Sequence, residues 1–351
     1  MPATYPLADL LGTAIPLIQA PMAGSQLSPL AIASSNAGVL GSLPAAMLSY
    51  EALESELALL ARGTSQPYNV NFFCHVPPAA DAVREHAWRA LLAPYYAEWG
   101  IDPSAVPAGA GRVPFTQEAA DVLEEFRPAV VSFHFGLPAD DLLARVKAWG
   151  SVVLSSATTL DEARWLEAKG VDAVIAQGVE AGGHRGMFLS TDLTTQRPVR
   201  ELVPLFKQHL RVPIIAAGGI VTAKDVIAMR ILGADGVLVG SAFLLATEAA
   251  VAAVHRTALR LAAGAPRDTA ITNLFTGRPA RGVVNRLMRE RGPMSALPPA
   301  FPLAAAAIAP LRAAAEKAGS GDFSPLWCGA GGTPFAETGA AEIIAGLCEG
   351  F

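Results

Sequence analysis

The chain has 351 residues, of which 52% are hydrophobic and only 16% charged, so it can bury a large core and does not have the composition of a disordered protein. Its 26 basic and 31 acidic residues give a net charge of −5, and no cluster of Lys and Arg stands out, so nucleic acid is not an expected partner. No apolar run reaches the roughly 18 residues that a membrane span requires, and no basic segment followed by an apolar core opens the chain. We therefore expect a cytoplasmic protein without membrane association.

The cysteines and histidines show no spacing typical of metal ligands. Cys74, Cys328 and Cys348 are widely scattered, which is typical of free thiols in a reducing compartment and makes neither a disulfide framework nor a Cys-x-x-Cys site. We expect no metal centre.

Apolar runs recur with a rhythm typical of repeated βα units. Eight such runs predict strands at Ile15–Ala20, Gly38–Leu43, Tyr68–Phe73, Ala129–Phe135, Ser151–Ser156, Asp172–Ala176, Val212–Ala216 and Gly236–Val239. Helical periodicity between most of them predicts helices at Ser28–Ser35, Tyr50–Ala61, Ala139–Trp149, Leu160–Lys169 and Thr222–Leu232. Eight βα units favour a closed (β/α)8 TIM barrel. The alternative, an open doubly wound sheet, lacks the expected Gly-x-Gly-x-x-Gly after the first strand.

Two segments exceed the barrel pattern. About residues 77–114 form an insertion after the third strand, with a helix over Ala79–Ala97, and we expect this insertion to cap the barrel mouth. With the barrel placed at residues 1–245, residues 246–351 remain as a mainly helical C-terminal extension. Within it, Leu303–Ala318 indicates one helix interrupted at Pro310. We expect this extension to pack on the barrel or to contribute to a homodimer contact.

The loop after the sixth strand, Gln177–Gly186, is the strongest candidate for chemistry. Parallel strands deliver such loops to the carboxyl end of a barrel, where active sites lie. Gly182 and Gly183 let the backbone approach a ligand, and His184 supplies a side chain that titrates near neutral pH. We therefore expect His184 to bind substrate or abstract a proton.

Glycine-bearing turns follow the seventh and eighth strands, the usual position of a phosphate site in such barrels. Neither turn contains a basic residue, so we expect backbone amides to hold the phosphate of a cofactor. The residues are Ala217, Gly218 and Gly219 in the first turn and Leu238, Val239, Gly240 and Ser241 in the second.

Other strand ends offer a surface for a flat ring. Ala20, Pro21 and Met22 form an extended apolar turn after the first strand. The side-chain amides of Asn69, Asn71 and Gln177 can donate to and accept from the polar edge of a pyrimidine-like ring. A phosphate cradle, an apolar turn and these amides together fit flavin mononucleotide (FMN).

Five segments resemble the nitronate monooxygenases, formerly called 2-nitropropane dioxygenases, and the resemblance runs from about residue 15 to about residue 290. They are Gln19-Ala-Pro-Met-Ala-Gly24, Ser132-Phe-His-Phe-Gly136, Gln177-Gly-Val-Glu-Ala-Gly-Gly-His-Arg-Gly186, Ala216-Ala-Gly-Gly-Ile220 and Thr276-Gly-Arg-Pro-Ala-Arg-Gly282. The third segment is the most specific.

The resemblance implies an FMN-dependent barrel enzyme that oxidises alkyl nitronates with O2 to a carbonyl compound and nitrite, without a nicotinamide. Ser241 stands where the family commonly has threonine, and Trp327–Gly332 departs from the Gly-Gln that the family often has there, which leaves the tail's contribution to the site open. The resemblance implies that His184 faces the substrate and that FMN is held by Met22, Asn71, Gln177, Gly182, Gly183, Gly218, Gly219, Gly240 and Ser241.

Further charged and aromatic residues are secondary candidates. His134, which alternates with Ser132 on the fourth strand, and His75 are candidates for the substrate pocket. Glu180 and Arg185 flank the glycine loop, where charged residues are usually solvated. Arg278 and Arg281 favour structural pairing or a subunit contact over chemistry.

Two other functions remain open on the same fold. One is an NAD(P)H-dependent FMN quinone or enoyl-thioester reductase, and the other is a non-redox phosphate-binding barrel such as an aldolase or isomerase. The absence of an obvious lysine at a strand end disfavours Schiff-base chemistry.

Overall fold

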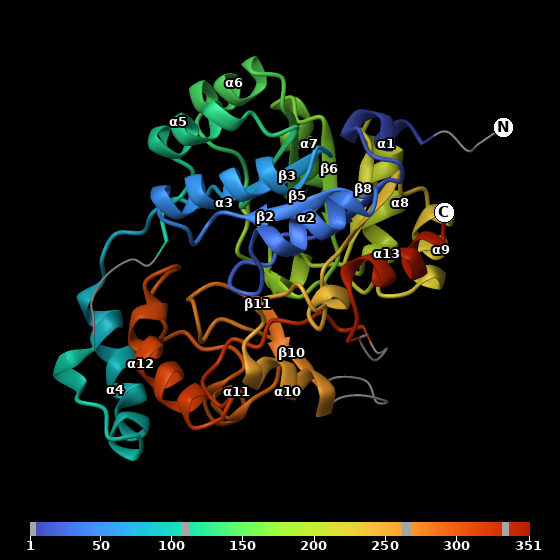
Figure 1. The fold of residues 1–351 in the computed structure, drawn as a ribbon. Coiled ribbons are helices and arrows are strands. Elements are labelled where there is room, and N and C mark those ends of the chain that lie inside the picture. The colour runs from blue at the N-terminus through green and yellow to red at the C-terminus, as the bar shows by residue number, and fades with distance from the viewer. Residues whose placement is uncertain (1–4, 107–111, 262–267, 332–336) are drawn as a thin grey trace.

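The computed structural model describes residues 5–106, 112–261, 268–331 and 337–351 (Figure 1). Eight parallel strands lie in the order β1, β9, β8, β6, β5, β4, β3, β2. The two outermost strands meet, because the amide of Gln19 donates to the carbonyl of Leu40 at 2.9 Å and the amide of Leu40 donates to Leu17 at 3.0 Å. The predicted (β/α)8 barrel is confirmed. Its strands are β1 (Leu17–Gln19), β2 (Gly41–Pro44), β3 (Tyr68–Phe73), β4 (Val130–His134), β5 (Val152–Ala157), β6 (Ala173–Gln177), β8 (Ile214–Ala217) and β9 (Gly236–Val239).

Helices surround the strands and bury one face each against them. The first seven positions of the ring are taken by α2 (Ser28–Asn36), α3 (Tyr50–Gly63), α5 (Gln117–Phe126), α6 (Asp140–Ala148), α7 (Leu160–Ala168), α8 (Val199–His209) and α9 (Ala223–Ile231). The C-terminal helix α13 (Ala340–Cys348) packs against both α9 and α2 and so occupies the eighth position. The sequence analysis had indicated neither α5 nor α8, although each buries a regularly spaced apolar face, and α8 contains Pro204.

Alternate strand residues point into the barrel, and their character changes along its axis. Ile18, Leu154 and Ile215 belong to an apolar cluster in the interior. The short helix α1 (Pro6–Leu11) adds Leu7 and Leu11 to this cluster and closes the amino-terminal end of the barrel. Only the opposite end, at the carboxyl termini of the strands, is left to hold a ligand.

A second, three-stranded antiparallel sheet lies at that open end, and the sequence pattern did not indicate it. It consists of β10 (Thr269–Thr272), β11 (Ala280–Val283) and β7 (Gly183–His184), in that order. Ala280 pairs with His184 and Arg281 with Gly183. The candidate loop is therefore the edge strand of a sheet that the C-terminal region supplies.

The insertion after β3 packs on the C-terminal region, below the barrel in Figure 1. Trp88 and Tyr96 of α4 (Ala82–Glu98) are buried against α12 (Ala304–Lys317) and donate to the carbonyls of Ala304 and Ala307 at 3.3 Å and 2.7 Å. Both contacts lie on the N-terminal side of Pro310, and α12 runs through this proline without a break, where an interruption was expected. The remaining elements of this region are η1 (Pro103–Ala105), α10 (Ala253–Leu261) and α11 (Arg286–Arg291), and η2 (Leu193–Thr195) and η3 (Ser241–Phe243) lie in barrel loops.

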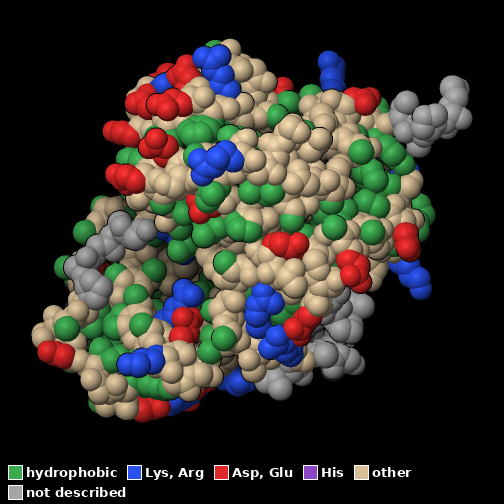
Figure 2. Space-filling model, viewed as in Figure 1, with side chains coloured by type: hydrophobic (Ala, Val, Ile, Leu, Met, Phe, Trp, Pro, Cys, Tyr) green, Lys and Arg blue, Asp and Glu red, His purple; other side chains and the backbone are tan. Residues whose placement is uncertain are grey.

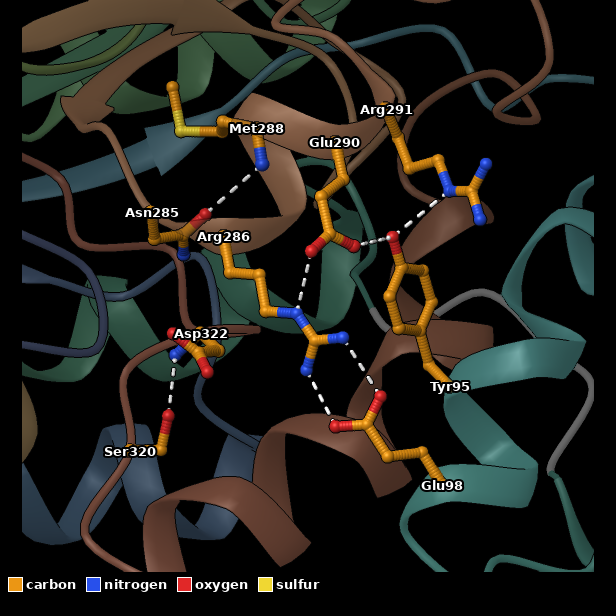
Figure 3. A network of polar contacts seen from close by, with 9 residues as sticks. All are labelled: Tyr95, Glu98, Asn285, Arg286, Met288, Glu290, Arg291, Ser320 and Asp322. Atoms are coloured by element: carbon orange, nitrogen blue, oxygen red, sulfur yellow. Dashed lines mark hydrogen bonds and ion pairs between the residues drawn. The ribbon is translucent and has the colours of Figure 1, made fainter.

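A polar network joins α4 to α11 (Figure 3). The guanidinium of Arg286 binds both carboxylate oxygens of Glu98, at 2.6 Å and 2.8 Å, and reaches Glu290 at 2.8 Å. Glu290 also accepts a 2.6 Å hydrogen bond from the hydroxyl of Tyr95, which in turn accepts from Arg291 at 2.9 Å. The insertion and the C-terminal region are thus tied together by both apolar packing and charge. The division of the chain at residue 245 stays a prediction, and residues 107–111 of the predicted insertion lie outside the described residues.

The face shown in Figure 2 carries mixed charges, with acidic side chains gathered over α5 and α6. Arg145 of α6 pairs there with Asp121 at 2.7 Å and also with Glu124 of α5. Such exposed pairs contribute little to stability, so the core carries most of it. No helix among the described residues is both long and apolar enough to cross a membrane.

We predict that the insertion depends on its buried face. Leu92 of α4 is 0% exposed, whereas Val83 of the same helix is 79% exposed. Leu92→Ala should lower the free energy of unfolding by about 2–5 kcal/mol, because it removes buried methyl groups and leaves a cavity. Val83→Ala should change it by less than about 0.5 kcal/mol. Urea unfolding of both variants tests this, and equal effects would contradict the packing described.

Candidate active site

One large cavity, of about 1350 Å³ counted with the space open to solvent, lies at the carboxyl ends of the barrel strands. Cofactor and ligand sites are concave pockets of this kind. Most residues predicted for the site line it: Ala20, Pro21, Met22, Asn71, His134, Gln177, Gly182, Gly183, His184, Ala217, Gly218, Gly219, Leu238, Gly240 and Ser241.

Three candidate residues do not line the cavity: Val239, His75 and Asn69. Val239 alternates with Leu238 on β9 and points into the core between strands and helices. His75 is 4% exposed, and its ring packs edge-on against Phe301 at 4.8 Å and Phe135 at 6.4 Å. His75 is therefore covered by aromatic residues instead of facing the cavity.

The cavity also has lining residues that the sequence did not indicate. Ser132 and Ser156 continue the inward alternation of β4 and β5, a signal that the strand pattern contained. Phe73 follows Asn71 on the same face of β3, so the strand pattern contained it as well. The other residues arrive from distant loops and carried no local signal: Arg112, Trp327, Gly329 and Gly331.

Gln177, at the end of β6, fixes the backbone of the candidate loop. Its Nε2 donates to the carbonyl of His184 at 2.9 Å, and its Oε1 accepts from the amide of Gly186 at 2.7 Å. Because both ends of the amide are used within the loop, Gln177 positions residues 184–186. This role differs from the ring contact that was expected of it.

Arg185 supports the same loop from behind. Its guanidinium is fully buried and donates to the carbonyls of Gly178 at 2.7 Å and Gln177 at 2.8 Å, and to the side chain of Gln196 at 2.9 Å. The expectation of a solvated side chain is wrong here, because three backbone and amide oxygens replace water around the charge. Glu180, which precedes the glycine pair, accepts from the amide of Val199 at 3.0 Å.

The His184 ring lies between a hydrogen bond and an aromatic wall. Its Nε2 is 3.0 Å from the hydroxyl of Thr276, and that hydroxyl is 3.4 Å from the carbonyl of Arg278. The 3.0 Å contact fits either direction: with the proton on Nε2 the hydroxyl accepts and turns its own proton toward the Arg278 carbonyl, and with the proton on Nδ1 the hydroxyl donates to Nε2. No described residue hydrogen-bonds this Nδ1, and the ring lines the cavity. Phe301 and Trp327 pack around it, with ring centres at 5.3 Å and 5.5 Å.

Both ring nitrogens of His134 are hydrogen-bonded. Its Nε2 lies 3.2 Å from the carbonyl of His184 and must donate there, so its Nδ1 accepts from the hydroxyl of Ser156 at 2.6 Å. A Cβ at Gly186 would lie 2.7 Å from that hydroxyl and 2.9 Å from the His134 ring, so only glycine fits at this position. His134 is a positioning residue for His184 as well as part of the cavity wall.

Burial keeps these histidines neutral. Burial has the largest effect, with the charge of Arg278 next, and the two lower the pKa of His134 to about 3. For His184, burial has the largest effect and the charge of Arg112 the second largest, and together they hold its pKa well below the ordinary value. Burial and Arg278 lower the pKa of His75 to about 4, and burial lowers that of His255 in α10 to about 4. At neutral pH the cavity therefore presents uncharged imidazoles.

The turns after β8 and β9 form a cradle on one side of the cavity. Gly218 and Gly219 have φ values of +112° and +72°, a conformation that disfavours side chains. Gly240 precedes η3, and the Oγ of Ser241 accepts from the amide of Gly329 at 2.9 Å. The segment 327–331 thus contributes to the site, although Trp327–Gly332 departs from the family pattern. Gly332 lies outside the described residues.

Gly182 and Gly183 have different roles. A Cβ at Gly182 would lie 2.5 Å from the amide nitrogen of Gly329 and 2.6 Å from the carbonyl carbon of Cys328, so Gly182 allows close contact with the tail. Gly183 has φ +73° and open space at its Cβ position, so its conformation is what requires glycine. The adjacent glycines serve backbone packing and a turn, in addition to any approach to a ligand.

The polar groups facing the cavity are amides and hydroxyls. Asn71 donates to the hydroxyl of Ser132 at 2.9 Å and to its carbonyl at 3.2 Å, whereas Asn69 lies deeper and donates to Ser42 at 3.0 Å. Asn69 therefore does not share the site with Asn71. The described residues contain no group of three or more His, Cys, Asp or Glu side chains arranged for a metal ion, and the three cysteines are free thiols.

We predict that Gly182 is required for the seating of the tail. Gly182→Ala should lower the free energy of unfolding by about 1–3 kcal/mol, because its Cβ would overlap backbone atoms that cannot easily move. Gly346→Ala is the matched control, since its Cβ meets nothing within 4 Å inside helix α13, and it should stabilise the protein by up to about 1 kcal/mol. Chemical denaturation compares them, and a harmless Gly182→Ala would refute this contact.

We also predict loss of stability in mild acid. Between the ordinary histidine pKa near 6.5 and about pH 4, the unfolded chain binds protons that buried His134 and His255 do not, so stability falls as pH falls, by up to about 1.4 kcal/mol per pH unit for each. Urea unfolding at pH 7, 6 and 5 measures this slope. His255→Asn should flatten it, whereas His209→Asn, at an exposed position in α8, should leave it unchanged. Identical slopes in wild type and His255→Asn would contradict the prediction.

Comparison with known proteins is consistent with this site. The family model described as nitronate monooxygenase matches residues 4–350. A nitronate monooxygenase of Pseudomonas aeruginosa is 41% identical over 348 residues, covering 97% of both chains. One from Paraburkholderia phytofirmans is 39% identical over 347 residues, covering 97% of this chain and 93% of the relative.

Solved structures agree in fold. A nitroalkane oxidase from Streptomyces ansochromogenes superposes with a TM-score of 0.86 at 35% identity and covers 98% of each chain. FabK from Thermotoga maritima, with a TM-score of 0.71 at 23% identity over 99% of this chain and 96% of its own, shares the fold alone. The chain therefore belongs to the nitronate monooxygenase family, a family of flavin-dependent oxidoreductases.

Proposed function

We propose that the protein binds FMN and uses O2 to oxidise alkyl nitronates to a carbonyl compound and nitrite. The observation that carries the proposal is the position of His184, which the Gln177 amide and the β7–β11 pairing fix at the wall of the cavity that the glycine turns at 218–219 and 240 also line. The family to which the chain belongs supports the same activity.

The cavity residues fit FMN. The turns at Gly218–Gly219 and Gly240–Ser241 would hold the phosphate with backbone amides and the Ser241 hydroxyl, as phosphate sites after the last two barrel strands do. Met22 and Ala20 would pack against the ring, and the Asn71 amide would meet its polar edge. When bound, FMN supplies the electron transfer that oxidises the substrate and passes the electrons to O2.

The protein's own contribution is to bind and orient the substrate. Phe73 and Trp327, which line the cavity beside His184, would exclude water. With Nε2 accepting from the Thr276 hydroxyl, Nδ1–H of His184 would donate to an oxygen of the substrate. A neutral imidazole whose pKa is far below neutrality binds a proton weakly, so it is poorly suited to deprotonate a neutral nitroalkane. A nitronate, which has already lost its α-proton, needs no such base, and this favours His184 as a binding residue.

The test is aerobic turnover of ethylnitronate by FMN-loaded protein, followed by nitrite formation and O2 uptake. We expect both, with much slower turnover of neutral nitroethane. His184→Asn should lower kcat/KM for ethylnitronate by about 10- to 100-fold, mainly through KM, because it removes a hydrogen bond to a charged ligand.

Three results would count against the proposal. Absence of nitrite and O2 uptake would reject the activity, and absence of yellow colour and FMN uptake would reject the cofactor. Rapid bleaching of the flavin by anaerobic NADH would instead favour the NAD(P)H-dependent reductase. Equal turnover of nitroethane and ethylnitronate, lost together in His184→Asn, would restore His184 as a base.

A further inference from the structure

A partly buried guanidinium, whose Nη1 is fully buried, faces the cavity without a counter-ion. Arg112, between the insertion and α5, is the only formally charged side chain among the described residues that line the cavity. It forms no ion pair with any Asp or Glu of the described ranges, and residues 1–4, 107–111, 262–267 and 332–336 include no acidic residue. A desolvated cation without a partner is unfavourable, so the free protein maintains this charge at a cost in stability.

The hydrogen-bonding capacity of Arg112 is also unused. Its Nη1 is buried and has no partner among the described residues, and Nη2 reaches only the sulfur of Met47 at 3.6 Å. Burial lowers the pKa of Arg112 to about 10, so the guanidinium is still charged at neutral pH. A planar anion could accept hydrogen bonds from the guanidinium N–H groups of Arg112 that lack an oxygen partner among the described residues.

Arg112 is on the substrate side of the cavity, away from the phosphate cradle. In the closed ring of strands, β3 lies across from β8 and β4 lies across from β9. The glycine turns follow β8 and β9, whereas Arg112 belongs to the segment after β3. Its guanidinium carbon is 5.6 Å from the centre of the Phe301 ring, and the His184 ring is 5.3 Å from the same centre. Arg112 and His184 both line the cavity, and Arg112 is the charge that acts most strongly on the His184 ring, so a small ligand between them can touch both.

We infer that Arg112 binds the negative charge of the substrate and makes the site select anionic nitronates over neutral nitroalkanes. This inference rests on the proposed function for the identity of the anion. Each nitronate oxygen carries part of the negative charge, and a guanidinium fork matches two such oxygens in one plane. The neutral imidazoles of His134 and His184 cannot replace this charge, so Arg112 is the specificity-determining residue.

The test compares propionate with propionamide, two unreactive ligands of similar shape that differ in charge, by calorimetric titration of the FMN-loaded protein. Wild type should prefer propionate by about 10- to 100-fold, the range of a hydrogen-bonded charge pair. Arg112→Met should abolish the preference, and Arg112→Lys should restore part of it. Arg62→Met, which removes an exposed charge in the last turn of α3, should behave as wild type.

Two further measurements separate this role from a structural one. Arg112→Met should unfold at a denaturant concentration no lower than wild type, because it removes an unpaired, partly buried charge, whereas a structural arginine would lower that midpoint. The KM for ethylnitronate should rise by about 10- to 100-fold in Arg112→Met, with a smaller change in kcat.

Several outcomes would overturn the inference. Equal binding of propionate and propionamide by wild type would contradict it, and so would a preference for propionate that persists in Arg112→Met. Weaker FMN binding in Arg112→Met with an unchanged propionate preference would assign Arg112 to the cofactor. A propionate preference that depends on Arg112 in a protein that forms no nitrite would leave the anion site in place and reject only the proposed chemistry.

Discussion

The site depends on how one short backbone stretch, residues 183–186, is held. A loop of this length with two glycines has many conformations, and fixing it costs conformational free energy. Gln177 binds it from the cavity side, Arg185 from behind, and β11 along its edge. These hydrogen bonds are buried, so breaking any one leaves an unsatisfied polar group, and the loop has one low-energy position. The fixed backbone in turn determines the orientation of the His184 side chain.

This constraint links distant parts of the chain. Residues 280–283 supply the neighbouring strand, Thr276 orients the His184 ring, and the segment 327–331 packs on Gly182. The same C-terminal region is buried against the insertion helix α4 through α12 and Arg286. The barrel strands line the base of the cavity, whereas the C-terminal region, which packs on the insertion, supplies the contacts that hold the His184 imidazole in place.

The repeating strands and helices could be predicted from the sequence, whereas contacts between segments far apart in the chain could not. Strand rhythm, alternation and glycines at strand ends placed His184, Gly218 and Gly240 at one end of a barrel, because these signals are local. The three-stranded sheet was not predictable, since β7 has two residues and its partners are almost a hundred residues away. Arg112 gave no signal either: an arginine in a loop rich in proline, glycine and alanine is ordinarily solvated, and only the surrounding fold removes its water and its counter-ions. Gln177 was placed correctly at the cavity, but its amide is occupied by the loop that it positions.

The electrostatics of the cavity follow from the same packing. Burial that lowers the pKa values of His134 and His184 also strips water from Arg112 and Arg278, and neither arginine has a carboxylate partner. Arg278 is stabilised by the face of Phe135, 3.9 Å away, a residue whose φ of +71° is itself strained. Both arginines keep one unpartnered buried nitrogen, but Arg278 also donates to the carbonyl of Met187. Arg112 has weaker support, because its contact with Phe301 is longer, at 5.6 Å, and its only side-chain hydrogen bond among the described residues is to the sulfur of Met47. Of Arg112 and Arg278, Arg112 faces the cavity and is therefore the side chain whose free energy a bound anion would lower most.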